Sequence, residues 1–255
     1  MSGAGAQGRR TALVTGAAGT MGKAATAGLL ADGVRVAMAD LDARALERAA
    51  REVAGAATAD QLTTIAFDVT DPLACGSAVE RIGREFGPID ILVNNAGILS
   101  RNKLADTTPE EWHRVLAVNL DGAFYLCRAC VPGMKERRWG RIINISSVAA
   151  KSGGITAGTA YSVSKSAMIG LTFTLAAETA SCGITVNGIA PAYVKTPMVT
   201  EQLSEQDRRM VISKIPVGRY CEPEEFAHVV RFLASPMAGF ITGEVIDQNG
   251  GLVFD

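Results

Sequence analysis

Residues 9–42, RRTALVTGAAGTMGKAATAGLLADGVRVAMADLD, decide the fold of this chain. They predict a short apolar strand, a glycine-rich turn, a helix and a second strand that ends at Asp40. Glycines at positions 16, 19 and 22 allow a tight turn, close approach of the backbone to a ligand, and close packing of the helix on the strand. Because the turn opens a helix, unpaired N–H groups and the positive end of the helix dipole face whatever binds there. The stretch therefore predicts a pyrophosphate site.

Asp40 indicates which dinucleotide this site binds. A carboxylate at the end of the second strand can accept hydrogen bonds from both hydroxyls of an adenosine ribose. A 2′-phosphate at the same place would set two anionic groups against each other. The turn offers Ala18 and Gly19 rather than a base, and the strand is followed by Leu41 and Asp42. The sequence therefore predicts NAD(H) as the cofactor, in preference to NADP(H).

Tyr161, Lys165 and Ser147 form a second set of candidate residues. Tyr161 and Lys165 are four residues apart in AYSVSKSAMIGLT, and Ser147 ends the upstream segment INISS. The i, i+4 spacing places the tyrosine and the lysine on one face of a helix. A nearby ammonium favours the phenolate and is expected to lower the tyrosine pKa. Such a pair is a candidate general acid/base, although the same spacing also occurs on solvated helix surfaces.

The composition limits the class of protein. A chain of 255 residues can bury a sizeable core as one domain, and a formal net charge of −1 without a basic block gives no indication of nucleic acid or an anionic membrane. Residues 1–9 lack the apolar core of a secretory signal and are expected to form a flexible tail. We expect no membrane-spanning stretch. An odd number of cysteines, five, suggests a reducing compartment, and the predicted location is cytoplasmic.

Neither the cysteines nor the histidines predict a metal or redox centre. Cys127 and Cys130 form a C-x-x-C spacing, but they lie inside a helical pattern and are interpreted as small apolar residues on one face. His113 and His228, the only histidines, belong to no ligand cluster.

Apolar strands and amphipathic helices alternate along the chain, which predicts a doubly wound parallel α/β sheet of about seven strands with helices on both faces. The predicted strands are Thr11–Thr15, Val34–Ala39, Thr63–Asp68, Ile89–Asn94, Arg141–Ser146, Thr185–Ile189 and Glu244–Gln248. The predicted helices are Gly22–Asp32, Ala43–Ala54, Pro72–Phe86, Pro109–Lys135, Ala160–Ser181 and Pro223–Leu233. Residues 10–255 are expected to be one domain, in which 190–216 form a long irregular loop.

These ordered motifs resemble the compact, single-domain branch of the short-chain dehydrogenase/reductase family over nearly the whole chain. The resemblance implies a Rossmann-type fold, hydride transfer between a nicotinamide and a secondary alcohol or ketone, and a homotetramer. It also implies that residues 190–216 are the substrate loop. The implied catalytic residues are Asn119, Ser147, Tyr161 and Lys165. The implied cofactor-binding residues are Gly16, Gly19, Thr20, Met21, Gly22, Asp40, Leu41, Asp68, Val69, Asn95, Ala96, Gly97, Tyr161, Lys165, Pro191, Val194 and Thr196, with no metal ligand.

The resemblance further assigns roles to these residues. It implies that Tyr161 exchanges the proton and that Ser147, rather than Ser146, binds the substrate oxygen. Lys165 would lower the tyrosine pKa and hold the nicotinamide ribose, and Asn119 would hold a proton-relaying water or simply mark a helix distortion.

Two positions depart from the branch. Thr20 stands where a glycine is usual, which gives the T-G-x-x-G-x-x-G spacing of the family's extended branch, and Ala192 follows Pro191 in place of glycine. The glycine spacing suggests an epimerase or dehydratase as one alternative function. The resemblance also leaves open a non-catalytic NAD-binding redox sensor and, as a specific substrate class, a 3-oxoacyl thioester reductase. By analogy, the substrate pocket is expected to be largely apolar and to suit a small cyclic or aliphatic ketone. Its expected residues are Leu99, Ala149, Ile155, Tyr193 and Met198.

Overall fold

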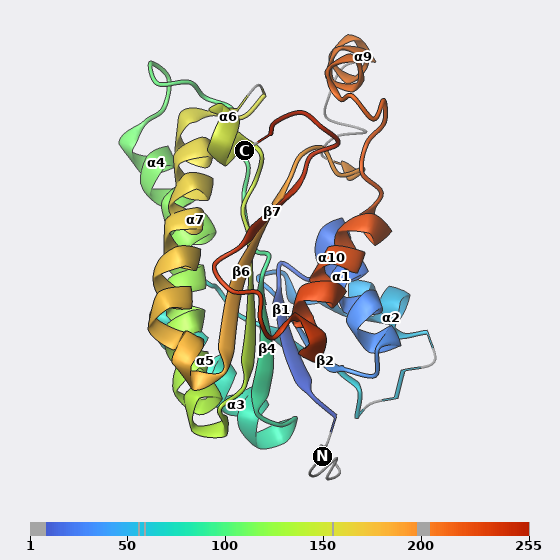
Figure 1. The fold of residues 1–255 in the computed structure, drawn as a ribbon, viewed down its shortest axis with the longest axis vertical. Coiled ribbons are helices and arrows are strands. Elements are labelled where there is room, and N and C mark those ends of the chain that lie inside the picture. The colour runs from blue at the N-terminus through green and yellow to red at the C-terminus, as the bar shows by residue number, and fades with distance from the viewer. Residues whose placement is uncertain (1–8, 56, 59, 155, 198–204, 255) are drawn as a thin grey trace.

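The computed structural model describes residues 9–55, 57–58, 60–154, 156–197 and 205–254. Its centre is a parallel sheet of seven strands in the order β3-β2-β1-β4-β5-β6-β7 (Figure 1). The strands are β1 (Thr11–Thr15), β2 (Arg35–Asp40), β3 (Leu62–Ala66), β4 (Ile89–Asn94), β5 (Gly140–Ile145), β6 (Ile184–Pro191) and β7 (Val245–Gln248). The predicted doubly wound parallel sheet is confirmed. The strand order reverses between β1 and β4, which makes this the topological switch point of the sheet. Ligands of such sheets bind at the carboxyl ends of the strands beside the switch point.

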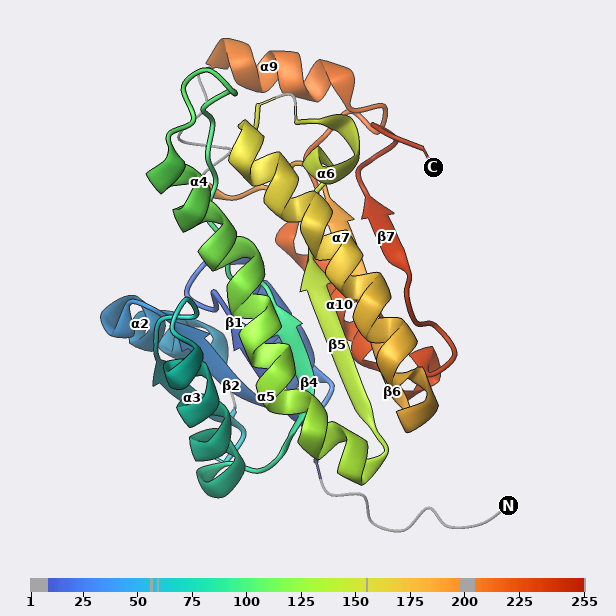
Figure 2. The same ribbon diagram turned by 90° about the vertical axis from the view of Figure 1, so that its left-hand side faces the viewer.

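Helices cover both faces of the sheet (Figures 1 and 2). One face carries α1 (Thr20–Ala31), α2 (Ala43–Ala54) and α10 (Pro223–Ala234). The opposite face carries α3 (Pro72–Glu85), α5 (Gly122–Arg137) and α7 (Thr159–Thr179), with α4 (Pro109–Leu116) leading into α5. Since successive strand side chains point to opposite faces, Leu13 packs in one core cluster while Ala12 and Val14 pack in the other. Burial on both faces explains the continuous apolar strands.

Two predicted segments differ from the structure. The helix predicted over Pro109–Lys135 is interrupted by a π-helical segment at Ala117–Asp121. Residues 190–216 are not irregular throughout: β6 continues to Pro191, and α9 spans Glu205–Lys214. Figure 2 shows α9 beyond the carboxyl ends of the strands, above the short helix α6 (Ala149–Ser152). Residues 198–204 of this predicted loop, and residues 1–8 of the predicted tail, lie outside the described residues.

The expectation about membrane-spanning length was wrong. In the part of the chain that the structure describes, Pro109–Arg137 is long and apolar enough to cross a membrane by length and composition alone. The same stretch packs within the domain, where α5 contacts α3 and the sheet, as the core helices of soluble proteins also do. Inside the domain, 39% of its most apolar stretch is buried.

Candidate active site

A cavity of about 720 Å³ opens at the carboxyl ends of the strands, beside the switch between β1 and β4. Every residue predicted to bind the cofactor lines it. These residues are Gly16, Gly19, Thr20, Met21, Gly22, Asp40, Leu41, Asp68, Val69, Asn95, Ala96, Gly97, Tyr161, Lys165, Pro191, Val194 and Thr196. Ser147 lines the cavity too, whereas Asn119 does not. The sheet therefore brings two distant sequence motifs to one cavity of a size typical for a cofactor or substrate.

The glycine turn leaves no room for side chains. Gly16 has a φ of +61°, and a Cβ there would lie 2.9 Å from the Cα of Ala96. A Cβ on Gly22 would lie 2.4 Å from the carbonyl oxygen of Gly16, so the first turn of α1 presses directly on the loop. Glycine is required at both positions, in the way expected of a dinucleotide turn.

The N-terminus of α1 fits a pyrophosphate. Its N-cap is Gly19, which has no side chain to accept hydrogen bonds from the first N–H groups of the helix, and its first turn contains no acidic residue. These donors and the positive end of the helix dipole therefore suit an anion. Thr20, which replaces the family's usual glycine, is the first residue of α1 and lines the cavity. The departure from the common motif thus adds a hydroxyl-bearing residue to the cavity lining.

Asp40 is oriented by the backbone around it. Its Oδ2 accepts a hydrogen bond of 3.0 Å from the Ala18 N–H, and its Oδ1 accepts one of 2.8 Å from the Leu41 N–H. Each carboxylate oxygen keeps a lone pair that a ribose hydroxyl can use. Lys23, a base that also lines the cavity, pairs with Glu52 at 2.5 Å. The adenosine end of the cavity thus presents an anchored carboxylate, which fits an unphosphorylated ribose.

Thr15 is a residue that the sequence prediction missed. Its Oγ1 accepts hydrogen bonds from the N–H groups of Asn95 (3.1 Å) and Ala96 (3.0 Å), and Asn95 Nδ2 donates to the carbonyl oxygens of Thr15 and Gly16. These bonds tie the glycine turn to the segment after β4. A hydroxyl-bearing residue at the end of a buried apolar strand, directly before the turn, is the signal that could have identified it. Asp68 and Val69, predicted to end β3, instead follow its last residue, Ala66.

Ser147, Tyr161 and Lys165 meet on the opposite wall of the cavity. The Lys165 ammonium donates to the carbonyl oxygen of Ile145 at 2.7 Å and lies 5.9 Å from the centre of the Tyr161 ring. Ser147 follows β5 and faces the cavity, and its Oγ accepts a hydrogen bond from Ala149 N–H. Ser146 donates instead to the carbonyl oxygen of Lys165, at 2.7 Å, and so fixes α7 against β5.

Burial determines the charge state of this group. The Tyr161 pKa is raised, because removal from water disfavours the phenolate more than a hydrogen bond with Ser147 favours it. Lys165, which was expected to lower this pKa, is not among the causes of the shift, and the net direction is upward. Burial also lowers the pKa of Lys165 to about 8. At neutral pH Tyr161 carries its proton, ready to donate, and Lys165 is mostly an ammonium.

Asn119 lies behind the catalytic wall and is fully buried. Its Oδ1 accepts from the Ile98 N–H at 2.8 Å, and its Nδ2 donates to the Ile98 carbonyl and to Ser164 Oγ, each at 3.0 Å. The π-helical segment around it is the distortion that one interpretation of the sequence expected. Asn119 thus joins the loop after β4 to α7. Its side chain bonds to Ile98 and Ser164 and does not line the cavity.

A second pocket, of about 170 Å³, shares Ser147 and Tyr161 with this cavity. Leu99, Ala149 and Tyr193, three of the expected substrate-pocket residues, line it. The other two, Ile155 and Met198, lie outside the described residues. The lining is mostly apolar, as predicted from the sequence.

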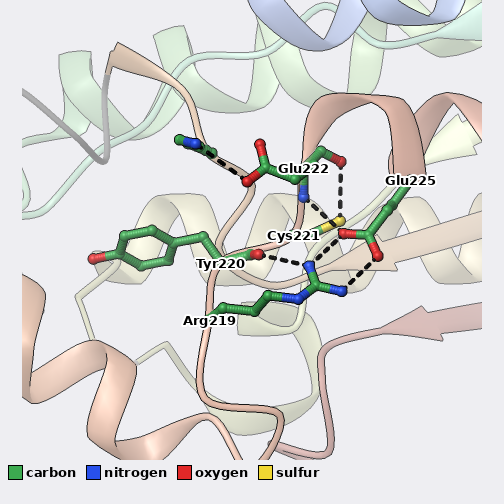
Figure 3. A network of polar contacts seen from close by, with 6 residues as sticks. Arg219, Tyr220, Cys221, Glu222 and Glu225 are labelled. Carbon is green, nitrogen blue, oxygen red and sulfur yellow. Dashed lines mark hydrogen bonds and ion pairs between the residues drawn. The ribbon is translucent and has the colours of Figure 1, made fainter.

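The start of the predicted substrate loop is attached to the N-terminus of α10. Cys221 N–H donates to the Tyr193 carbonyl at 3.0 Å, and Lys195 N–H donates to the Cys221 carbonyl at 2.9 Å. Beside this short bridge, the Arg219 guanidinium makes two hydrogen bonds, of 2.6 and 2.8 Å, with the Glu225 carboxylate (Figure 3). These contacts hold the backbone on either side of a cavity-lining residue, Val194.

Glu225 connects the bridge to the helix. It accepts a hydrogen bond of 2.9 Å from the Glu222 N–H, which completes a capping box at the start of α10 (Figure 3). The hydrogen bonds from Arg219 and then from Glu222 lower the Glu225 pKa to about 2. Lys195 also pairs with Glu222, at 3.2 Å. None of these contacts was predicted from the sequence.

The cysteines and histidines form no centre among the described residues. No group of three His, Cys, Asp or Glu side chains in that part of the chain is placed to hold a metal ion. Cys127 and Cys130 are buried on α5, and burial raises the pKa of both thiols. Since the thiolate is the reactive form, this pair is suited to packing rather than to redox chemistry.

The known proteins that resemble this chain carry the names of reductases. A family model described as enoyl-(acyl carrier protein) reductase matches residues 16–253. The chain is 42% identical over 247 residues to an acetoacetyl-CoA reductase of Rhizobium meliloti, covering 96% of this chain and 99% of the relative. It is 39% identical over 244 residues to a 3-oxoacyl-[acyl-carrier-protein] reductase of Thermotoga maritima, covering 96% and 98%. The Escherichia coli protein with that name is 40% identical over 248 residues, covering 95% and 97%.

Proposed function

The chain belongs to the short-chain dehydrogenase/reductase family, whose members use nicotinamide cofactors, and we propose that it is an NAD(H)-dependent oxidoreductase acting on a secondary alcohol or ketone. The observation that carries the proposal is the single cavity shared by two groups. The glycine turn and Asp40 line one end, and Ser147, Tyr161 and Lys165 line the other. A dinucleotide spanning the cavity would present its nicotinamide to these three residues.

Each catalytic side chain has a distinct task in this proposal. The nicotinamide, when bound, supplies or accepts the hydride. Ser147 donates a hydrogen bond to the substrate oxygen and orients it toward Tyr161. The Tyr161 hydroxyl gives its proton to that oxygen during reduction and takes it back during oxidation. Lys165, fixed by the Ile145 carbonyl, holds the nicotinamide ribose with its remaining N–H donors. The raised Tyr161 pKa keeps this hydroxyl protonated at neutral pH, which is the form that reduction requires.

The preference for NAD(H) rests on Asp40. Its carboxylate is held in place by two backbone N–H groups, so it cannot turn away from a 2′-phosphate without losing both bonds. Lys23, the cavity-lining base, is engaged by Glu52. A phosphate would therefore meet a fixed negative charge in a partly buried place.

Within this reaction, 3-oxoacyl thioesters are the substrate class that the relatives favour. Acetoacetyl-CoA and 3-oxoacyl-[acyl-carrier-protein] are named as substrates of proteins that match nearly the whole chain. The apolar pocket beside Tyr161 would accommodate the acyl chain. A small neutral ketone is compatible with the same apolar lining.

We further propose a homotetramer in the cytoplasm, the assembly and location expected from the sequence. Phe124 on α5 and Phe173 on α7 are about half exposed on the outer helices, and two-fold packing of these helices would cover them. The cysteines are free thiols, as suits a reducing compartment. Light scattering at micromolar concentration tests the assembly, and a monomer would contradict it.

The function is tested by following NADH absorbance with purified protein. The panel contains acetoacetyl-CoA, an acyl-carrier thioester, small neutral ketones and polyols, with NADH or NAD⁺ as appropriate. We expect carbonyl-dependent NADH oxidation, with thioesters among the best substrates. Binding of NADH without turnover of any panel member would instead favour a non-catalytic sensor.

A further inference from the structure

Arg101 is the only charged residue among the described residues that line the 170 Å³ pocket. This pocket shares Ser147 and Tyr161 with the large cavity, so a substrate carbonyl in reach of both hydroxyls would lie where the two meet. The rest of the described lining is apolar, small or hydroxyl-bearing. It consists of Leu99, Ser147, Val148, Ala149, Ser152, Gly154, Thr156, Ala157, Tyr161, Ala192, Tyr193, Leu252 and Val253.

The two neighbours of Arg101 in the sequence bind the carboxylate of Glu111. Ser100 Oγ and Asn102 Nδ2 both donate to the carboxylate of Glu111 on α4. These hydrogen bonds, with the charge of Arg114, lower the pKa of Glu111. Arg101, between the two donors, does not contribute to that shift and lines the pocket instead. The carboxylate of Glu111 is thus engaged by Ser100 and Asn102.

The backbone that carries Arg101 is fixed to the helix that carries Tyr161. Gly158 N–H donates to the Ser100 carbonyl at 2.7 Å, and Thr159 N–H donates to the Asn102 carbonyl at 2.9 Å. A Cβ on Gly158 would lie 2.8 Å from the carbonyl carbon of Arg101, so the two segments are in close contact. Because α7 begins at Thr159 and carries Tyr161, these contacts fix the backbone of Arg101 relative to Tyr161.

We propose that Arg101 binds an anionic group of the substrate, a carboxylate or a phosphate, while Ser147 and Tyr161 hold its carbonyl. This inference rests on the proposed oxidoreductase function and names the substrate chemistry of the same site. A guanidinium presents a planar fork of donors that matches carboxylate and phosphate oxygens. A free 3-oxo acid would place the anion within the small pocket. Arg101 is exposed, so it is also accessible to a group outside the pocket. A coenzyme A or acyl-carrier thioester would bring a phosphate to the pocket entrance, within reach of this residue.

The test compares Arg101→Gln with the wild type on three substrates that share a carbonyl: acetoacetate, its neutral methyl ester, and acetoacetyl-CoA. Loss of a charged hydrogen bond should lower kcat/KM about 30-fold for the anionic substrate that Arg101 recognises. The methyl ester should change less than about twofold, because it carries no charge for the arginine to bind. If kcat/KM falls only for acetoacetate, Arg101 binds the substrate carboxylate. If it falls only for acetoacetyl-CoA, Arg101 binds a phosphate. Equal losses for all three substrates, or no loss for either anion, would overturn the inference.

Arg114→Gln is the matched control. It removes one exposed positive charge on the other side of Glu111, from a residue that does not line the pocket. It should leave all three kcat/KM values unchanged, and melting temperatures should show that both variants fold. If the wild type reduces none of the substrates with NADH, the proposed function fails on its own. Arg101 is then tested by the rise in melting temperature with acetoacetate or with inorganic phosphate, which the wild type should show and Arg101→Gln should lack. An equal rise in both proteins, or none in either, would contradict the site.

Discussion

The carboxylate of Asp40 accepts a 3.0 Å hydrogen bond from the backbone N–H of Ala18, so the end of β2 is joined directly to the glycine turn that follows β1. The acid that we propose selects the ribose is therefore hydrogen-bonded to the turn that we propose receives the pyrophosphate. Any change at Asp40 should affect cofactor selection more than chemistry.

Asp40→Asn keeps the shape of the side chain and removes its charge. We expect the wild type to prefer NADH over NADPH by about 10²-fold in kcat/KM, from one partly buried charge clash of about 2–3 kcal/mol. The variant should shrink that preference to less than about tenfold, mainly by weakening NADH binding. Steady-state kinetics with both cofactors measures the ratio.

Asp42→Asn is the control for this substitution. Asp42 caps α2 by accepting from the N–H groups of Arg44 and Ala45, which an asparagine oxygen also does. This variant loses a charge two residues away and should keep the wild-type cofactor preference. A wild type that uses NADPH as efficiently as NADH would refute the assignment of Asp40.

The lowered pKa of Lys165 predicts a pH profile. With a pKa of about 8, the ammonium is present below that pH and is lost above it. Because kcat/KM reports ionisations of the free enzyme, kcat/KM for NADH should be flat below pH 8 and fall about tenfold per unit above it. In Lys165→Met the fall near pH 8 should vanish, at a much lower level of activity. A wild-type profile that stays flat to pH 9.5 would show that this lysine does not control cofactor use.

The Arg219–Glu225 pair predicts an effect on cofactor binding at a distance. Glu225→Gln removes one charge of a pair that is about half exposed, so its effect on stability should stay below about 1 kcal/mol. The bridge that positions Val194 should loosen, and KM for NADH should rise several-fold while kcat changes little. The control is Glu85→Gln, which breaks the similarly exposed Arg81–Glu85 pair on α3. If Glu225→Gln and Glu85→Gln change KM for NADH equally, the bridge does not position Val194.

The sequence predicted the sheet and the cavity because their determinants are local. Buried strands appear as apolar runs, and the glycine turn with Asp40 occupies one continuous stretch. Every predicted cofactor residue consequently lines one cavity. Strand and helix boundaries were mostly within two residues of those observed.

The predictions that failed, or that were not made, depend on contacts between distant segments. Spacing placed Tyr161 and Lys165 on one helix face, but only the packing of α7 against β5 shows that burial raises the tyrosine pKa. The role of Thr15 appears only when β4 lies beside β1. The pocket position of Arg101 likewise depends on the loop being held against the start of α7. Side-chain spacing along a sequence carries no information on such burial.

Single-turnover reduction by Tyr161→Phe tests the central claim most directly. Phenylalanine keeps the ring and removes the hydroxyl that is to give the proton, while NADH binding should stay within about twofold of wild type, measured by its fluorescence. We predict that NADH oxidation with the best carbonyl substrate slows by about 10²-fold or more. A variant that retained more than about a third of the wild-type rate, with NADH binding unchanged, would contradict the assignment of Tyr161 as the proton donor.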